Sequence, residues 1–239
     1  MDTIKENLAV IRKRMARACK NAGREVDEVR LLMATKTVEP ERILKAFSCG
    51  EFLIGENKSQ ELVEKYEALS PVPHESHFIG HLQSNKIKDV IPRVQCVQSI
   101  DRLSLAEKIN RRLESEGRVL DILVQVNTSA EESKFGCKPT EALDLVFEIS
   151  KMPHLNIKGL MTIGLFTDDS EKVRKCFKLL QEVRHDIIDR HFKNVVMDVM
   201  SMGMSGDLEV AIEEGSTLIR VGTDIFGKRI YPDSYYWNE

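Results

Sequence analysis

Lys36 lies at the end of an apolar run, residues 29–35, that predicts a buried β-strand. An amine at the C-terminal tip of a strand is placed where β/α barrels keep their functional groups. Such a lysine can form a Schiff base with a carbonyl compound when burial or neighbouring cations lower its pKa. The alternative is a lysine that ends the strand and extends its charged head into water.

Two glycine-containing loops near the end of the chain indicate a site for an anion. Residues 201–207 follow one predicted strand, and residues 222–227 follow the next. Glycine lets backbone N–H groups approach a ligand closely, and the loops after the last two strands are the recurrent phosphate site of β/α barrels. Hydroxyl donors can come from Ser201, Ser205 and Thr223. The alternative is that Ser205 or Asp207 only caps a helix and that the glycines serve tight turns.

Arg220 lies within the last predicted strand, where a buried guanidinium needs a partner. A carboxylate can supply that partner, and so can the ring nitrogen of a bound heterocycle. With Lys36 as the amine, Arg220 at a ring and Gly222 with Thr223 at a phosphate, the implied ligand is pyridoxal 5′-phosphate. A Schiff-base aldolase that binds a sugar phosphate in the same loops is a further possibility, in which Arg220 has no heterocyclic partner.

Apolar runs alternate with helix-period segments along the whole chain. The predicted strands are residues 30–35, 52–55, 77–80, 94–99, 121–127, 157–163, 195–200 and 217–221. The predicted helices are residues 3–22, 40–49, 58–69, 102–116, 140–151, 170–191 and 207–214. Strict alternation favours a single α/β domain over residues 1–239, a (β/α)₈ barrel with an additional N-terminal helix. A doubly wound open sheet is the alternative, since sequence does not show closure.

Helix ends carry recognisable signals. Asp101 is a candidate N-terminal cap for the helix that contains Leu103, and Gly117 follows the last turn of that helix. Gly50 and Gly215 likewise stand just past their helices.

Composition narrows the class of protein. The 239 residues are 42% hydrophobic and 31% charged, with a net charge of −3, which is typical of a soluble globule with no general attraction to nucleic acid or to a membrane. Five scattered cysteines without a CxxC pair argue against disulfides and zinc. His77 and His81 lack a third metal ligand. The absence of a signal peptide predicts the cytoplasm. Lys65, with other lysines, is explained equally by a basic surface or by a solvated helix face.

Several motifs together resemble the pyridoxal phosphate homeostasis protein family, a single-domain relative of the alanine racemase N-terminal barrel. They are LMATKT (32–37), IGEN (54–57), HFIGHLQSNK (77–86), GLMT (159–162), SMGMS (201–205) and RVGTDIFG (220–227). The resemblance spans nearly the whole chain. It implies the barrel of fold-type III pyridoxal phosphate enzymes, without their C-terminal β-domain.

The resemblance also implies roles for individual residues. Lys36 holds pyridoxal phosphate as a Schiff base, and Arg220 faces the pyridine nitrogen. Ser201, Gly222 and Thr223 hold the phosphate. Asn57 lies near the ring, and Ser205 is a further candidate for the cofactor site. His81 is either part of the site or a structural histidine, and the structural role is favoured.

The implied function is to buffer pyridoxal phosphate or to deliver it to apo-enzymes, with little turnover. An arginine leaves the ring nitrogen largely unprotonated, which restricts the carbanion chemistry of the cofactor. A racemase or related enzyme is the alternative, but it needs a proton donor opposite Lys36. The C-terminal segment 231–237 follows soon after the last strand, and its tyrosines are interpreted as packing or tail residues. With no second domain to complete a shared site, a monomer is expected.

Overall fold

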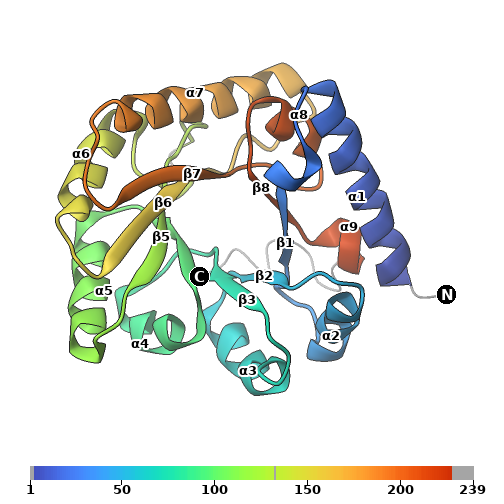
Figure 1. Ribbon diagram of the computed structural model, residues 1–239, viewed down its shortest axis with the longest axis horizontal. Helices are drawn as coiled ribbons and strands as arrows, with labels where there is room; N and C mark the ends of the chain where they lie inside the picture. The colour runs from blue at the N-terminus through green and yellow to red at the C-terminus, as the bar shows by residue number, and fades with distance from the viewer. Residues whose placement is uncertain (1–2, 132, 228–239) are drawn as a thin grey trace.

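Parallel strands β1 to β8 close into a barrel in the computed structural model, which describes residues 3–131 and 133–227 (Figure 1). The strands are β1 (Arg30–Ala34), β2 (Leu53–Glu56), β3 (Glu75–Phe78), β4 (Cys96–Ile100), β5 (Leu120–Gln125), β6 (Leu155–Met161), β7 (Val195–Ser201) and β8 (Leu218–Val221). Strand β8 pairs with β1 in parallel, with Arg30 opposite Leu218, and this pairing completes the ring. The (β/α)₈ barrel is thereby confirmed, and the open sheet is excluded.

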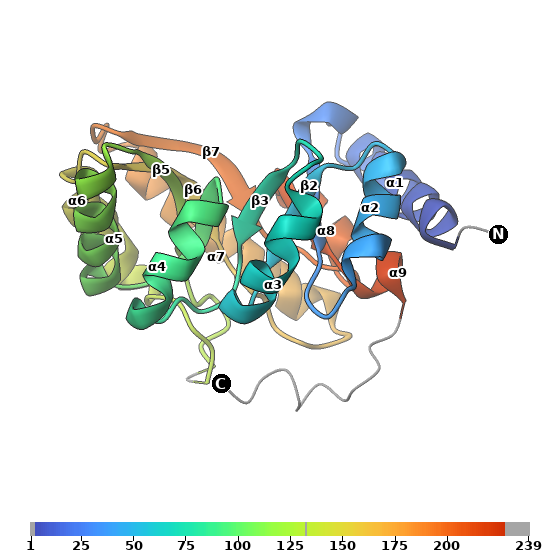
Figure 2. The ribbon, with the colours of Figure 1, turned by 90° about the horizontal axis from the view of Figure 1, so that it is seen from below.

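Helices surround the barrel on its outside. They are α1 (Thr3–Asn21), α2 (Pro40–Ser48), α3 (Ser59–Leu69), α4 (Ile87–Val90), α5 (Leu103–Glu116), α6 (Pro139–Ser150), α7 (Ser170–Ile188), α8 (Leu208–Glu213) and α9 (Thr223–Phe226). The additional N-terminal helix, α1, lies beside α8 and α9, as Figure 1 shows. In Figure 2, α1, α2 and α9 lie together at one end of the molecule, and α5 and α6 lie at the other.

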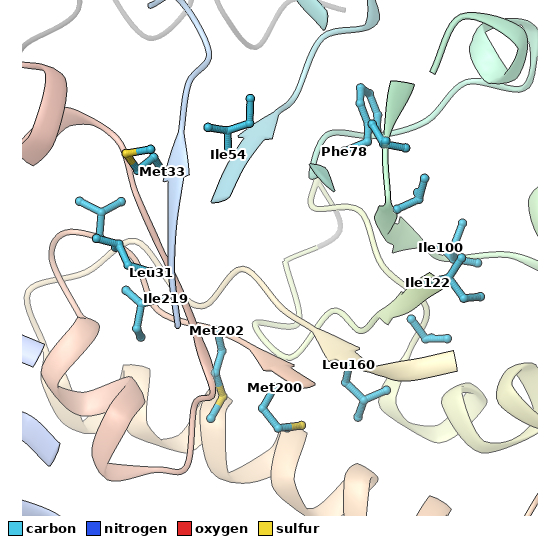
Figure 3. Close-up of a cluster of buried hydrophobic side chains, with 14 of the residues drawn as sticks. Leu31, Met33, Ile54, Phe78, Ile100, Ile122, Leu160, Met200, Met202 and Ile219 are labelled. Carbon is cyan, nitrogen blue, oxygen red and sulfur yellow. The ribbon is translucent and has the colours of Figure 1, made fainter. Parts of the chain in front are cut away.

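The main hydrophobic core lies between the strands and the helices. Because side chains alternate across a strand, Leu31 and Met33 of β1 join this core while Leu32 belongs to a separate small cluster with Leu53 and Leu218. Figure 3 shows Met33, Leu160 and Met200 directed from their strands toward the surrounding helices. The small clusters leave room for polar side chains among the strands.

Element boundaries agree with the sequence-based expectations to within a few residues. The largest shifts among the strands, two residues at both ends, are in β3, predicted at 77–80 and observed at Glu75–Phe78, and in β6, predicted at 157–163 and observed at Leu155–Met161. The chain leaves the sheet before Gly80, where an added Cβ would lie only 1.9 Å from the carbonyl oxygen of Asn57. The short helices α4 and α9 were not predicted, because four residues are too few to show a helical period.

Predicted helix ends are confirmed in part. Gly50, Gly117 and Gly215 have positive φ angles of 91°, 63° and 88°, as expected for residues that end helices. The prediction that Asp101 caps α5 is wrong. The N-cap is Arg102, and the Asp101 carboxylate instead accepts a 2.5 Å hydrogen bond from the Arg102 guanidinium.

Candidate functional site

A cavity of about 1090 Å³ opens at the C-terminal ends of the strands. Its lining includes six of the seven residues that the sequence predicted for a cofactor site, together with His81. The six are Lys36, Asn57, Ser205, Arg220, Gly222 and Thr223. They come from the loops after β1, β2, β7 and β8, except Arg220, which lies within β8. The structure thus brings together residues from both ends of the sequence.

Ser201, the seventh predicted residue, does not line this cavity in the described part of the chain. Its side chain is fully buried at the end of β7, where the hydroxyl accepts a hydrogen bond from Arg220 Nη1 at 2.6 Å. The same hydroxyl donates to Gln98 Oε1, also at 2.6 Å. Its hydroxyl proton is therefore donated within the barrel rather than toward an anion in the cavity.

The backbone on both sides of Lys36 is held by charged side chains, of which Lys65 and Glu56 are buried and Glu61 is half-buried. Lys65 Nζ donates to the carbonyl oxygen of Thr35 at 2.8 Å, and the Thr35 hydroxyl donates to Glu56 Oε1 at 2.7 Å. On the other side, the backbone N–H of Thr37 donates to Glu61 Oε2 at 2.6 Å. Thr37 has a φ of +62°, which is unfavourable for a β-branched residue and must be held by its surroundings.

Lys65 connects these two sides, since its ammonium lies 2.8 Å from Glu56 Oε1 and 2.7 Å from Glu61 Oε2. Burial alone would lower the pKa of Lys65, but the two carboxylates outweigh it and raise that pKa. Burial raises the pKa of Glu56, and the neighbouring Lys65 opposes this change. Lys65 is only 8% exposed, so the interpretation of this residue as part of a solvated helix face or a basic surface is wrong.

Arg220 carries a positive charge into the barrel. Its Nη1 donates to Ser201 and its Nη2 donates to the carbonyl oxygen of Thr162 at 2.7 Å. Within residues 3–131 and 133–227, no carboxylate forms an ion pair with Arg220. Burial lowers the pKa of Arg220 to about 10, with Asp207 opposing the change, so the guanidinium remains protonated at neutral pH. A protonated group that lines the cavity without an ionic partner is suited to an acceptor on a bound ligand.

The two predicted phosphate loops lie side by side and are tied together by Arg14 of α1. Its guanidinium donates to the carbonyl oxygen of Ser205 at 2.8 Å and to Asp224 Oδ2 at 3.0 Å. Gly222 packs so closely that an added Cβ would lie 2.9 Å from the carbonyl oxygen of Ala34. As far as the described residues go, the hydroxyls of Ser205 and Thr223 have no hydrogen-bond partner.

Asn57 and His81 form another part of the cavity wall. The Oδ1 atom of Asn57 is buried without a hydrogen-bond partner among the described residues, as is Nδ1 of His81. The His81 ring stacks on Phe135, with 3.8 Å between the ring centroids and 15° between the planes. Burial lowers the pKa of His81, and Asp101, 3.6 Å away, opposes this change. His81 thus packs against Phe135 and also lines the cavity, and the favoured structural role stays a prediction.

Together these groups fit a ligand with an aldehyde, a ring acceptor and a phosphate. Lys36 offers an amine, and the buried Arg220 offers donors. The Ser205 and Thr223 hydroxyls stand in loops suited to an anion, and Asn57 has an unpaired buried oxygen. The cavity residues therefore match the functional groups of pyridoxal phosphate.

The supporting residues were missed from sequence. Those that hold Lys36, Arg220 and the phosphate loops are Arg14, Glu56, Glu61, Lys65 and Gln98. Glu61 and Lys65 are four residues apart on α3, which is a recognisable helical ion pair. Nothing in that spacing indicates that the pair is buried against β1 and β2.

Metal ligands, cysteines and membrane-spanning helices are three further features of the chain. In the part of the chain that the structure describes, no group of three or more histidine, cysteine, aspartate or glutamate side chains could hold a metal ion. All five cysteines are free thiols. None of the described helices is both long enough and apolar enough to cross a membrane.

Comparison with known proteins gives consistent matches. Residues 1–230 match the family described as alanine racemase, N-terminal domain. The chain is 42% identical over 226 residues to a protein of Aquifex aeolicus named pyridoxal phosphate homeostasis protein, covering 95% of this chain and 98% of that one. A Pasteurella multocida protein of the same name is 39% identical, covering 96% and 99%. The solved structure of PipY from Synechococcus elongatus with pyridoxal phosphate bound has a TM-score of 0.82 at 27% identity, covering 94% and 100%.

Proposed function

We propose that this chain binds pyridoxal 5′-phosphate and buffers or delivers this cofactor. It belongs to the pyridoxal phosphate homeostasis protein family, within the larger alanine racemase N-terminal domain family. The observation that carries the proposal is that Lys36, Arg220 and the Gly222 loop line the same cavity. The related PipY holds the same cofactor. Bound pyridoxal phosphate would supply an aldehyde that exchanges reversibly between amines.

Each part of the cofactor has a matching group in this chain. The amine of Lys36 would hold the aldehyde, and the buried guanidinium of Arg220 would face the ring nitrogen. Thr223, Ser205 and the backbone at Gly222 would bind the phosphate, with Asn57 beside the ring. Ser201 would contribute through Arg220, since its hydroxyl is already bonded to that guanidinium.

The proposed role is that of a carrier rather than of an efficient enzyme. A guanidinium does not readily give up its proton to the ring nitrogen, so the ring withdraws electrons weakly. Racemisation also needs a proton donor opposite Lys36. Tyr231, Tyr235 and Tyr236, which the sequence analysis interpreted as packing or tail residues, lie outside the described residues. We further propose a cytoplasmic, monomeric, single-domain protein that supplies apo-enzymes with the cofactor.

The test is an absorption spectrum of the purified protein with added pyridoxal phosphate, followed by borohydride reduction and peptide mass mapping. We expect a yellow protein in which the reduced adduct maps to Lys36. A protein that stays colourless and takes up no cofactor would overturn the proposal. Turnover assays with amino-acid enantiomers separate the two roles: loss of one enantiomer's optical signal, abolished by Lys36→Ala, would establish a racemase instead.

A further inference from the structure

A chain of hydrogen bonds crosses the inside of the barrel and ends at Arg220. Ser201 lies on β7 and Gln98 on β4, and these strands are not neighbours in the closed order, so their bond spans the interior. Both side chains are fully buried. The successive distances are 2.6 Å from Arg220 Nη1 to Ser201 Oγ, 2.6 Å from Ser201 Oγ to Gln98 Oε1, 2.7 Å from Gln98 Nε2 to His77 Nδ1 and 2.7 Å from His77 Nε2 to Glu75 Oε1.

The chemistry of its two ends gives this chain a single direction. Arg220 can only donate, so the Ser201 oxygen accepts and the hydroxyl proton turns to Gln98. At the far end, hydrogen bonds from His77 and Arg30 lower the pKa of Glu75 to about 2, so its carboxylate only accepts at neutral pH. Between them, the Gln98 amide must donate to His77.

The direction of the chain fixes the state of His77. Its Nδ1 accepts from Gln98, so the proton of the neutral ring lies on Nε2 and is donated to Glu75. Every donor and acceptor used is complementary. The chain thus leads from the buried positive charge of Arg220 to the negative charge of Glu75 at the opposite end of the barrel.

We propose that Gln98 and Ser201 are positioning residues that hold the guanidinium of Arg220 toward the ring nitrogen of pyridoxal phosphate. His77 and Glu75 fix the direction of their hydrogen bonds. The ring-nitrogen part of this inference rests on the proposed function, whereas the chain itself belongs to the protein without ligand. Thr162 holds the second guanidinium nitrogen through its carbonyl oxygen, so loss of Ser201 removes one of the two hydrogen bonds that fix the plane of the group among the described residues.

The ligand-free protein tests the chain by NMR of ¹⁵N-labelled histidine, with the His77 signals assigned by their loss in His77→Gln. We expect a neutral ring protonated at Nε2. In Gln98→Glu the new carboxylate cannot donate, so we expect Nδ1 to gain a proton as well. A wild-type ring protonated at Nδ1 would overturn the one-way chain. If Gln98→Glu does not fold, the wild-type tautomer and Ser201→Ala still test the hydrogen-bond chain. A changed His77 signal in Ser201→Ala supports the chain, and an unchanged signal overturns it.

Ligand binding tests the positioning role. Titrations compare pyridoxal phosphate with its analogue in which carbon replaces the ring nitrogen. We expect Ser201→Ala and Gln98→Leu to weaken pyridoxal phosphate binding about tenfold and to leave the analogue within about twofold. Ser201→Ala removes a hydrogen bond to the buried charge of Arg220, and Gln98→Leu removes the acceptor that orients the Ser201 hydroxyl. Ser201→Thr, which keeps a hydroxyl at this position, should restore the preference for pyridoxal phosphate over the analogue. Ser99→Ala, next to Gln98 on β4 and equally buried but with no hydrogen bond in the described part of the chain, is the matched control.

The outcomes separate this inference from the proposed function. Equal weakening of both ligands would show a merely structural role, and no weakening would show that Arg220 is held without the chain; either result overturns the positioning role. If the wild-type protein bound neither ligand, the proposed function and the ring-nitrogen part would fail together. The histidine measurement would still establish or overturn the chain.

Discussion

Lys65 donates a hydrogen bond from its ammonium to the carbonyl oxygen of Thr35, 2.8 Å away, in the residue directly before Lys36. A second lysine therefore positions the predicted cofactor lysine. Lys65 itself is not among the described residues that line the cavity. Glu61 holds the N–H of the residue after Lys36 and also pairs with Lys65, so one cluster of charged side chains sets the backbone on both sides.

Replacing Lys65 with methionine should destabilise the protein and slow attachment of the cofactor to Lys36. Removal of one member of a buried ion pair leaves an uncompensated charge, which costs about 3–5 kcal/mol. Chemical denaturation measures the loss of stability, and the growth of the absorption band measures attachment. The double variant Lys65→Met/Glu56→Gln should recover part of the stability because it also removes the stranded carboxylate. Lys45→Met on the exposed face of α2 is the control; a similar loss there would contradict the assignment.

Replacing Arg14 with alanine should weaken binding of pyridoxal phosphate about fivefold to tenfold, roughly 1–1.4 kcal/mol. Arg14 bonds the Ser205 carbonyl and the Asp224 carboxylate, so its loss frees both phosphate loops to move apart. Titration calorimetry with pyridoxal phosphate and with pyridoxal, which lacks the phosphate, locates the effect. Binding of pyridoxal should hardly change. Arg17→Ala is matched, since Arg17 lies on the same helix with a longer 3.7 Å contact to Glu209. Equal effects of the two variants would argue against a special role for Arg14.

Much of the barrel could be predicted from sequence because strand burial and helix period are local signals. The run before Lys36 and the glycines at 203 and 222 have meanings that hold over a few residues. The predicted site followed from the rule that barrel function gathers at strand C-terminal ends and from the family resemblance, which implied the role of Asn57. Six of the seven predicted residues indeed line one cavity.

The supporting contacts could not be predicted, since they join distant parts of the chain. Ser201 and Gln98 are 103 positions apart, and each has the residue type of an ordinary strand or turn position. Arg14 lies 191 positions before Ser205. Ser201 looked like a phosphate ligand because its loop does, but only the closed barrel shows its hydroxyl turned to Arg220 and Gln98. The direction in which a side chain points at the end of a strand depends on the register of the strands and on closure of the barrel. Neither can be read from the sequence.

Replacing Lys36 with alanine should abolish the covalent link but leave weaker, phosphate-dependent binding. The loops with Ser205 and Thr223 and the guanidinium of Arg220 are unchanged by this substitution. Equilibrium dialysis with pyridoxal phosphate and with pyridoxal measures the binding that remains. Borohydride reduction followed by mass mapping checks that position 36 carries no adduct. Complete loss of pyridoxal phosphate binding in a folded variant would show that the phosphate loops contribute little.

Glu75 should make the stability of the protein depend on pH below about 4.5. A hydrogen bond from His77, followed by one from Arg30, lowers the pKa of Glu75 from 4.5 to about 2 in the folded protein. Between these values the unfolded chain binds a proton that the folded protein does not. The contribution of Glu75 to stability is therefore fully present above about pH 4.5 and is lost as the pH falls toward 2.

Denaturant unfolding of the wild type and of Glu75→Gln from pH 6 to pH 3 measures this contribution. The difference in free energy of unfolding should be largest at pH 6 and should shrink as the pH falls, because wild-type Glu75 then becomes protonated in the unfolded chain first. Glu64→Gln, at an exposed position on α3, should not show the trend. A difference that stays constant with pH would mean that the carboxylate does not anchor the hydrogen-bond chain through its charge. The interior orientation of His77 would then have to come from Gln98 alone.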